Sequence, residues 1–412
     1  MLIKLTVASL LSRKMMALLT VISIGVSLFV LLGVAHLKTE LRANFSRTVS
    51  GVDLIVGART SQLNLLLYSV FRMGEPSNNL SWQSYQKIAS DKGVSWAVPI
   101  SLGDSHQGYG VIGTTPDYFT HFKYADKQAL SFVQGRAFTH LYEVVLGADV
   151  ARQLNYKLGD EVQLSHGTGK HSFSHHDHYP FVVRGILQLT GTPIDQGVHI
   201  PIAAVDVIHQ NKKLENLALN DQRLNPNKQD GLSAFLLGVE NKIALLSLQR
   251  KINQDKEEAL SAILPGVALM ELWKIMGTVE TSLSLVSTLI LFSALLGMTT
   301  MLLASMRERE KEISVLRALG ARAGVIIWLV VSEAFLLTLA ACALGYLSLS
   351  LALFFSQSLL QQEYGLHISS LSFSPHTVWY FLMALTMAVL LAFIPAFLAY
   401  RRSLVSGLAL NR

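Results

Sequence analysis

Residues 306–322 read Met-Arg-Glu-Arg-Glu-Lys-Glu-Ile-Ser-Val-Leu-Arg-Ala-Leu-Gly-Ala-Arg and stand between two long apolar runs. On a helical projection the apolar and small residues fall roughly on one side: Ile313, Leu316, Ala318, Leu319 and Ala321. The charged residues fall mostly on the other: Arg307, Glu308, Lys311, Glu312 and Arg322. This division is typical of a helix that lies along a membrane surface. A helix there can receive a force applied from the cytoplasm. Periodicity alone leaves an alternative open, an ordinary solvated loop that only sets topology.

The composition indicates the class of protein. Of the 412 residues, 51% are apolar and only 15% are charged, and the mean hydropathy is +0.39, which is too apolar for a soluble protein of this length. The apolar residues gather in four runs, each near or above the roughly 20 residues that cross a hydrocarbon core of about 30 Å. We therefore predict an integral membrane protein with transmembrane helices at 15–36, 281–305, 325–355 and 378–399.

Basic residues predict the orientation of these helices, because cytoplasmic segments carry an excess of Lys and Arg. They cluster before the first run, between the second and third, and after the fourth: Lys4, Arg13 and Lys14; Arg307, Arg309, Lys311, Arg317 and Arg322; Arg401 and Arg402. This pattern places the N-terminus (1–14), the segment 306–322 and the C-terminus (400–412) in the cytoplasm. A large domain (37–280) and a short loop (356–377) then lie outside. A cleaved signal peptide is the alternative for the first run, but its apolar stretch is too long, so an uncleaved anchor is favoured.

The predicted external domain combines helices and strands. Strand patterns occur at 52–57 and 232–239, and helical patterns at 81–90 and 242–263. Between these outer elements the sequence changes to short strand patterns separated by glycine turns, at 110–113, 143–147, 161–164 and 181–187. The only cysteine, Cys342, lies in the third apolar run, so this domain can form no intrachain disulfide.

These patterns predict how the domain is built. A membrane-proximal α/β part, about 45–101 and 231–270, would carry an inserted β-rich subdomain, about 102–230. The polar stretch 211–230 within the insertion is predicted to be an exposed loop. The predicted fold class is thus a membrane protein: an α-helical four-span bundle with a large α+β extracytoplasmic domain inserted between the first and second spans.

Glu333 is the one formal charge inside the four apolar runs. A carboxylate near the middle of a membrane costs about 3 kcal/mol unless it faces protein or water. We therefore expect Glu333 on the inner face of the bundle or at a subunit interface, near Ser332 or Thr338. Two interpretations stay open, a packing or folding residue and a proton or substrate relay. Small residues four apart predict two points of close helix packing: Ser293 with Gly297, and Ala341 with Gly345.

A histidine-rich stretch follows residue 165. It contains His166, His171, His175, His176, Asp177 and His178, with His199 and His209 further on. Imidazoles at this density beside a carboxylate could bind Zn²⁺ or another late transition metal on a loop, with His171, His175, His176 and His178 as the ligands. No spacing within a predicted helix fixes a tetrahedron, so a merely solvated loop is the alternative. A pH sensor is a third interpretation, since several imidazoles would gain charge together below about pH 6.5.

Motifs of the common enzyme classes are absent from the sequence. The string nearest to a phosphate-binding loop, residues 167–170, lacks both the spacing of the motif and a following Ser or Thr. Neither G-x-S-x-G nor H-E-x-x-H occurs. We therefore expect that this chain does not hydrolyse ATP and is not an enzyme. Its net charge of +6 comes largely from the basic residues that set topology, so it does not indicate nucleic-acid binding.

Several stretches of the chain resemble a known family. The segment 306–321 looks like the signature cytoplasmic segment of FtsX-like and MacB-type ABC transporter permeases. Parts of the predicted external domain look like the periplasmic core domain of the same group: residues 111–119, Gly135 with Arg136, and residues 143–147, 158–162 and 183–187. Together with the four-span layout, the resemblance covers nearly the whole chain.

The resemblance implies a permease whose charged helix docks on a cytoplasmic ABC ATPase, so that ATP is used through that partner. The ATPase-coupling residues would be Arg307, Arg309, Glu310, Lys311, Glu312, Ile313 and Leu316. Their charges would meet the ATPase surface, while Ile313 and Leu316 would enter an apolar groove. MacB itself carries its ATPase fused at the N-terminus, whereas only about fourteen residues precede the first span here, so we expect a separate ATPase polypeptide.

The resemblance also implies the location and further partners. We expect a multi-pass protein of the bacterial inner membrane with both termini in the cytoplasm. A second permease chain would complete a homodimer or heterodimer, and a periplasmic adaptor or substrate protein could bind outside. The predicted function is export or extraction of a lipophilic, peptide or lipoprotein cargo, driven by motion passed to the outer domain. The alternatives are a non-transporting, FtsX-like regulator of a periplasmic partner and a metal-responsive membrane receptor.

Overall fold

The computed structural model describes residues 2–48, 50–125, 127–166, 180–209, 216–221, 224, 231–308, 323–364 and 375–409. The chain divides into two compact units. The helical unit contains Met1–Glu40, Gly277–Gln357 and Ile368–Arg412, and the α/β unit contains Leu41–Met276 and Ser358–His367.

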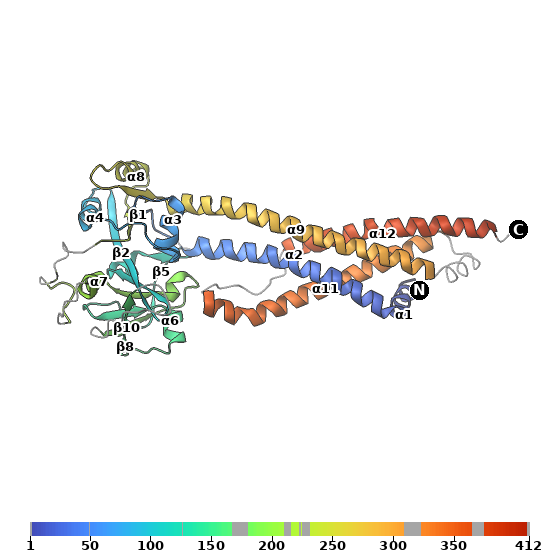
Figure 1. The fold of residues 1–412 in the computed structure, drawn as a ribbon, viewed down its shortest axis with the longest axis horizontal. Helices are drawn as coiled ribbons and strands as arrows, with labels where there is room; N and C mark the ends of the chain where they lie inside the picture. Colours follow the sequence, from blue (N-terminus) through green and yellow to red (C-terminus); the bar gives the residue numbers. More distant parts are fainter. Residues whose placement is uncertain are drawn as a thin grey trace. The chain divides into compact units, whose positions relative to one another are not determined.

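Among the described residues, five helices contribute to the helical unit (Figure 1): α1 (Leu2–Ser12), α2 (Lys14–Thr48), α9 (Pro265–Glu308), α11 (Ala323–Tyr364) and α12 (Pro375–Ala409). All but α1 contain a stretch long and apolar enough to cross a membrane: Lys14–Ala43, Pro265–Met306, Gly324–Gln357 and Pro375–Arg401. Each of these stretches includes one of the four predicted spans. The helices extend further than the predictions because helical hydrogen bonding continues into polar sequence, which a hydropathy pattern does not register.

Small residues bring the long helices close together. Alanines repeat every four residues along the buried side of α12: Ala384, Ala388, Ala392 and Ala396. At Gly345 of α11, a Cβ atom would lie 2.9 Å from the carbonyl oxygen of Gly25 in α2. The predicted close packing at Ala341 and Gly345 is therefore present, in the way that small residues permit in membrane bundles. At Gly297, by contrast, a Cβ would meet no atom within 4 Å among the described residues.

The α/β unit is built on a mixed sheet, which the described residues give as 11-stranded. Its main path runs β13 (Leu260–Ile263), β1 (Leu54–Ala58), β12 (Ala234–Val239), β2 (Val94–His106), β3 (Tyr109–Thr114), β11 (Val198–Pro201), β7 (Glu143–Leu146), β10 (Phe181–Leu187) and β6 (Phe132–Gly135). Off this path, β8 (Glu161–Val162) pairs with β10 and β9 (Ser165–His166) pairs with β2. A separate ribbon joins β4 (Lys123–Tyr124) to β5 (Gln128–Ala129).

The long strand β2 makes this sheet continuous. Its first half pairs with β12, where Val98 lies opposite Leu236, and its second half pairs with β3, where Leu102 lies opposite Ile112. Most neighbours are antiparallel, but β11 is parallel to β3 and β10 is parallel to β7. The sheet is therefore continuous at residues 101 and 102, the predicted boundary between the membrane-proximal part and the inserted β-rich subdomain.

Helices cover both faces of the sheet at its β1 end. Ile55 of β1 packs with Leu65 and Tyr68, from α3 (Gln62–Leu66) and the π-helical turn η1 (Leu67–Phe71). Its neighbours Leu54 and Val56 point the other way, toward α4 (Trp82–Ala89) and α8 (Leu245–Asn253). Since alternate residues of a strand face opposite sides, a strand buried on both faces needs a continuous apolar run, as β1 has. The remaining short helices are α5 (Asp117–His121), α6 (Ala148–Gln153), the 3₁₀ turn η2 (Pro193–Gln196) and α7 (Ile202–His209).

Strand predictions were correct where hydrophobic alternation or β-branched runs were strong. Six predicted runs correspond to strands: 52–57 to β1, 110–113 to β3, 143–147 to β7, 161–164 to β8, 181–187 to β10 and 232–239 to β12. The helix predicted at 81–90 is α4. The helix predicted at 242–263 is wrong over its last part, because α8 ends at Asn253 and residues 260–263 form β13. Pairing of Ile263 with Ile55, and burial of Leu260, outweigh the local helical pattern.

Gly147 provides a test of the packing between β7 and η2. A Cβ atom at Gly147 would lie 2.3 Å from the carbonyl oxygen of Asp195 and 2.4 Å from that of Ile194. We expect Gly147→Ala to destabilise the protein by about 2 kcal/mol or more, because overpacking forces the backbone apart. The control is Gly110→Ala, where a Cβ has open space. Thermal unfolding of both full-length variants in one detergent checks this, and equal midpoints would contradict the close approach.

Candidate functional site

The segment predicted to dock on an ATPase, residues 309–322, lies outside the described residues. Helix α9 is described as far as Glu308, and α11 begins at Ala323. Arg307 belongs to the last turn of α9. The other predicted docking residues are not described: Arg309, Glu310, Lys311, Glu312, Ile313 and Leu316. The structure therefore shows which helices lead into and out of this segment, while its contacts stay a prediction.

Both α2 and α9 reach into the core of the α/β unit. The ring of Phe45, near the end of α2, lies 4.6 Å from the ring of Phe71 and 5.7 Å from that of Trp273, near the start of α9, as measured between ring centroids. The Arg42 guanidinium lies over the Trp273 ring at 5.5 Å, a cation–π distance. Ala268 and Leu269 of α9 are buried in the same core. These aromatic contacts hold the two helix ends to each other and to the α/β unit.

The same two helices connect directly to paired strands. Helix α2 ends at Thr48 and β1 begins at Leu54, while β13 ends at Ile263 and α9 begins at Pro265. Strands β1 and β13 are antiparallel neighbours, with Ile55 opposite Ile263. The end of α2 and the start of α9 are therefore each joined to one of two hydrogen-bonded strands.

In the helical unit, α2 and α9 contribute to a second core. Ile24, Leu28 and Leu31 of α2 are buried there, as are Leu291, Leu295, Met298 and Leu302 of α9. Lys38 of α2 and Glu280 of α9 form an ion pair at 3.0 Å. Each helix is thus packed at both of its ends without a break in its helical backbone.

Glu333 is buried in the helical unit, with 2% of its surface exposed. Its neighbour Ser332 donates to the carbonyl oxygen of Leu329 and lies 3.1 Å from the hydroxyl of Thr6 in α1. Thr338 donates to the carbonyl oxygen of Ala334 one turn away. Burial avoids the cost of a carboxylate facing lipid. The two interpretations of Glu333, a packing or folding residue and a proton or substrate relay, stay predictions.

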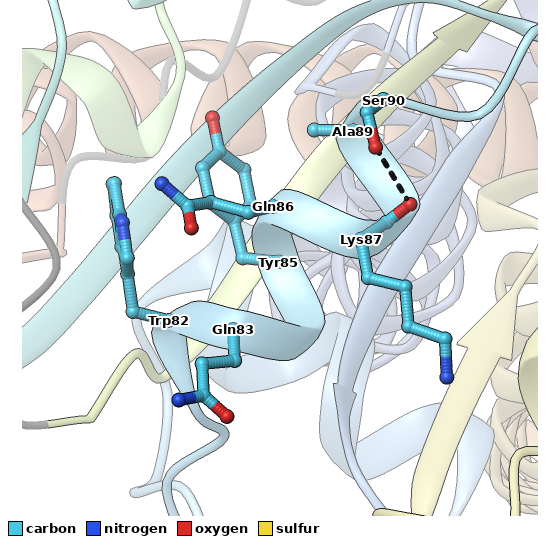
Figure 2. A pocket seen from close by; sticks show the side chains of 7 residues that line it. All are labelled: Trp82, Gln83, Tyr85, Gln86, Lys87, Ala89 and Ser90. Carbon is cyan, nitrogen blue, oxygen red and sulfur yellow. Dashed lines mark hydrogen bonds between the residues drawn. The ribbon is translucent and has the colours of Figure 1, made fainter.

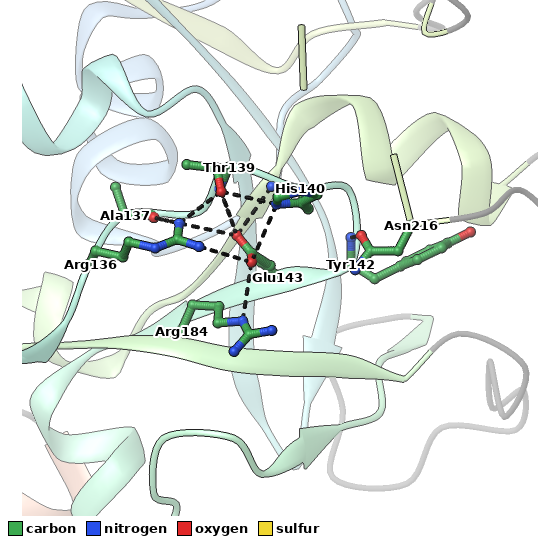
Figure 3. Close-up of polar contacts among 8 residues, drawn as sticks. All are labelled: Arg136, Ala137, Thr139, His140, Tyr142, Glu143, Arg184 and Asn216. Carbon is green, nitrogen blue, oxygen red and sulfur yellow. Dashed lines mark hydrogen bonds and ion pairs between the residues drawn. The ribbon is translucent and has the colours of Figure 1, made fainter. Parts of the chain in front are cut away.

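A polar cluster of the α/β unit surrounds Glu143, the first residue of β7 (Figure 3). Its side chain is almost completely buried. The backbone N–H groups of Thr139 and His140 donate to Oε2 at 2.6 and 3.1 Å. Arg184 donates through Nε to Oε1 at 3.1 Å, and Arg136 donates through Nη2 to the same oxygen at 3.3 Å. The cluster therefore ties the ends of β6 and β7 to β10.

The charge of Glu143 is stabilised by this arrangement. Burial by itself would raise the pKa of the Glu143 carboxyl. The N–H groups of Thr139 and His140, together with the Arg136 guanidinium, more than offset burial, so the pKa lies below its ordinary value. Both arginine side chains are about half exposed. Glu143 is consequently ionised at neutral pH and acts as the centre that orders two surface cations.

Two glycines allow the strands to approach around this cluster. A Cβ at Gly135, where φ is +79°, would lie 2.0 Å from the carbonyl oxygen of Arg184. A Cβ at Gly185 would lie 2.4 Å from the carbonyl oxygen of Arg136. Three short motifs noted separately in the sequence, Gly135 with Arg136, 143–147 and 183–187, therefore meet at one place. No local sequence pattern links them, because they come together only through the pairing of β6 and β7 with β10.

A shallow hollow lies beside α4 (Figure 2). Its lining comes from one helix and the residue after it: Trp82, Gln83, Tyr85, Gln86, Lys87, Ala89 and Ser90. The Lys87 ammonium is already paired with Asp255 at 3.0 Å and Glu257 at 2.8 Å. The Tyr85 hydroxyl donates to the carbonyl oxygen of Ala97. Because binding sites need polar groups that converge from several elements, we assign this hollow no ligand.

The predicted metal ligands His171, His175, His176 and His178 lie outside the described residues. Within the part of the chain that the structure describes, no group of three or more His, Cys, Asp or Glu side chains could hold a metal. His199, which follows the histidine-rich stretch, lies on β11 in the core beside the rings of Tyr118 and Phe119. Burial lowers the pKa of His199 to about 3, so its imidazole is uncharged.

Helix α1 and its contacts are not among the sequence predictions. Residues 1–14 are predicted only to lie in the cytoplasm, and Leu2–Ser12 form a helix that ends at a turn on Arg13. Arg13 is predicted only to set topology, and its side chain donates to a backbone carbonyl of α9. The apolar residues among positions 2–12 are a weak signal for this helix, and the contact of Arg13 has no signal in the sequence.

Comparison with protein families gives two matches, which together span most of the chain. Residues 17–238 match the MacB-like periplasmic core domain, and residues 284–404 match the FtsX-like permease C-terminal domain. No curated protein sequence matches the chain.

Solved structures that are similar to part of the chain include two regions of ABC-type transporters. One is the periplasmic region of MacB from Actinobacillus actinomycetemcomitans, at 12% identity and a TM-score of 0.34, covering 54% of this chain and 94% of that one. The other is the extracellular domain of the noncanonic ABC-type transporter YknZ from Gram-positive bacteria, at 13% identity and a TM-score of 0.31, covering 52% and 98%.

Replacing Glu143 tests the polar cluster. We expect Glu143→Gln to destabilise the protein by about 2 kcal/mol at neutral pH, because it removes the negative charge that faces two arginines and replaces one of the two acceptor oxygens with an N–H donor. Since the pKa of Glu143 is lowered on folding, this contribution is present above the ordinary carboxyl value of 4.5 and is lost as pH falls below it. Stability measured between pH 7 and 3.5 checks both points. The exposed Glu161→Gln is the control, and a Glu143 variant as stable as that control would contradict the role of the cluster.

Proposed function

Because the chain belongs to the family of FtsX-like ABC transporter permeases with a MacB-like periplasmic core domain, we propose that it transmits motion from a cytoplasmic ATPase to its α/β unit. The moving α/β unit then exports or extracts a lipophilic, peptide or lipoprotein cargo. The ATPase is a separate polypeptide, and this chain is not an enzyme. ATP enters the mechanism only through that partner.

The observation that carries this proposal is the continuity of α2 and α9. Each helix is packed into the core of the helical unit and into the core of the α/β unit, and each joins one of two paired strands, β1 and β13. A helix with an unbroken backbone resists compression along its axis, because every turn is hydrogen-bonded to the next. A shift or tilt imposed at one end is therefore felt at the other.

The membrane placement follows from the positions of charge. In a multi-pass protein, basic segments stay in the cytoplasm, so we place both termini and residues 306–322 there and residues 37–280 outside. The name of the matched periplasmic core domain supports an outer position for the α/β unit and a bacterial inner membrane as the location. The domain is then an insertion between the first and second spans.

The ATPase contact is assigned to the segment between α9 and α11. The segment has charges of both signs that can match a charged groove: Arg307, Arg309, Glu310, Lys311 and Glu312. Its apolar contacts come from Ile313 and Leu316. A second permease chain, identical or related, completes the assembly. Large apolar side chains exposed on the helical unit support contact with lipid or with that chain, among them Leu285, Leu289, Leu390, Phe393 and Phe397.

A second function is regulation without transport, in which the same motion activates a periplasmic partner. The two functions differ in one measurable respect. Transport requires that cargo moves in proportion to ATP hydrolysis, whereas regulation requires a partner of the α/β unit whose activity follows the nucleotide state. The large α/β unit that resembles a MacB-like core favours export.

Reversing charge in the segment tests the docking assignment. We expect Arg307→Glu, Arg309→Glu and Lys311→Glu, combined, to lower the affinity for the ATPase by at least tenfold, because several charge pairs at a docking surface contribute roughly 1 kcal/mol or more each. The chain is purified gently from its native membrane, the co-purifying subunit is identified by mass spectrometry, and MgATP hydrolysis is measured. Arg401→Glu, a reversal at an exposed basic residue after the fourth apolar run, is the control. Normal hydrolysis and retention of the ATPase in the triple variant would remove the docking role.

The metal prediction has a separate test. If the histidine-rich stretch binds Zn²⁺, calorimetry on the purified chain should give micromolar or tighter binding that is lost when His171, His175, His176 and His178 are replaced by Ala. Replacement of His376, an exposed histidine at the start of α12, should leave binding unchanged. Weak binding, or equal binding in both variants, would identify the stretch as a solvated loop.

A further inference from the structure

Helix α1 is separated from α2 by a single turn residue, Arg13. The N–H of Arg13 donates to the carbonyl oxygen of Leu10, and its own carbonyl accepts from the N–H of Ala17. The chain therefore passes from α1 into the first long helix through a short, hydrogen-bonded bend, and the side chain of Arg13 leaves the chain at that bend.

The Arg13 side chain contacts the last described turn of α9. Its Nη1 donates to the carbonyl oxygen of Ser305 at 2.8 Å. Ser305 lies three residues before Glu308, the last residue of α9 that is described, and is itself 2% exposed. The guanidinium is charged, so this hydrogen bond is charge-assisted and stronger than one from a neutral donor. Arg13 thus binds the last described turn of α9.

A second contact joins α1 to the beginning of α11. The hydroxyl of Thr6, which is fully buried, lies 3.1 Å from the hydroxyl of Ser332. Ser332 is in the third turn of α11, the helix to which residues 309–322 return. Leu10, one turn after Thr6, packs against the hydrophobic core of the helical unit. One short helix therefore touches both helices that carry the ATPase-docking segment.

The other side of α1 is apolar and exposed. Val7 is 42% exposed and Leu11 is 67% exposed, and the exposed apolar surface continues into α2 at Met15. A helix with one face against protein and another apolar face exposed fits the boundary between headgroups and acyl chains. Lipid contact on this face would keep α1 at the membrane surface, at the level where α9 ends and α11 begins.

We propose that α1 is a clamp: Arg13 and Thr6 fix the spacing between α9 at Ser305 and α11 at Ser332, and this spacing sets how tightly the chain binds its ATPase. Arg13 is a positioning residue in this arrangement, since it acts on ATPase binding through α9. The proposal rests on the proposed function for its consequence, but the spacing of the two helices can be measured without any ATPase.

The first experiment measures that spacing in the full chain. Nitroxide labels are placed at Ala304→Cys on α9 and Gly324→Cys on α11, both exposed positions, with the buried Cys342 replaced by Ala. A Cβ at Gly324 meets no atom within 4 Å among the described residues, so the label is tolerated there. In lipid nanodiscs, the distance distribution between the labels should be narrow in the parent and should broaden or shift with Arg13→Gln.

Matched variants separate the contacts from general effects. Lys14→Gln removes a positive charge from the next, exposed residue and should leave the distribution unchanged. Arg13→Lys should restore part of the order, because it keeps a donor and the charge. Thr6→Val removes the hydroxyl at nearly constant volume and should broaden the distribution, whereas Thr6→Ser should not. If Arg13→Gln fails to accumulate in the membrane, the Thr6 pair carries the test.

The second experiment measures coupling. In assemblies purified from the native membrane, Arg13→Gln should lower the affinity for the ATPase about tenfold, because loss of one charge-assisted hydrogen bond makes the docking geometry a minor population. Thermal unfolding of the α/β unit should not change. An unaltered distance distribution in both Arg13→Gln and Thr6→Val overturns the clamp, whatever the ATPase does. If no ATPase accompanies even the parent chain, the proposed function fails, and the distance measurement still decides on the clamp.

Discussion

Two helices, α2 and α9, must satisfy two different surroundings within one unbroken hydrogen-bonded backbone. Inside a bilayer, every N–H and C=O group must be paired within the segment, which an α-helix achieves. Beyond the bilayer, the same helices are kept helical by aromatic packing of Phe45 and Trp273 with the α/β core. Strand β1 begins a few residues after α2 ends, and α9 begins shortly after β13 ends. The pair of strands β1 and β13 is therefore joined directly to these two helices. The pairing of β1 with β13 therefore keeps the two strands that adjoin α2 and α9 next to each other.

The amino-acid sequence predicts the structure correctly where the determining forces are local. Four membrane helices follow from hydropathy because each run is long and free of charge apart from Glu333. Most strands follow from short β-branched or apolar runs ended by glycine. The prediction was wrong at residues 260–263, which a helical pattern includes. There the pairing of Ile263 with Ile55 determines the structure, and a partner some 200 residues away leaves no local pattern.

The polar sites could not be predicted for a similar reason. In the sequence, Glu143 belongs to the motif at 143–147 and shows no link to its partners. These partners, Arg136 and Arg184, lie 7 and 41 residues away along the chain. His199 follows a histidine-rich stretch in the sequence, but its position on β11 buries it among aromatic rings. A residue type indicates the chemistry that a side chain can perform. Only the pairing of strands decides whether that side chain becomes a buried structural centre or an accessible ligand.

Two polar contacts fix the axial register of α2 against α9 in the helical unit. Arg13 and Lys38 are 25 residues apart along the α2 side, and their partners Ser305 and Glu280 are 25 residues apart along α9, in the opposite direction. At a rise of 1.5 Å per residue this is about 37 Å, somewhat more than the hydrocarbon thickness of about 30 Å. Both contacts can therefore lie just beyond the hydrocarbon, where charged groups stay hydrated. A slip of one helical turn, about 5.4 Å, would break both at once, so α2 and α9 are expected to move together along their axes and to change mainly by tilting.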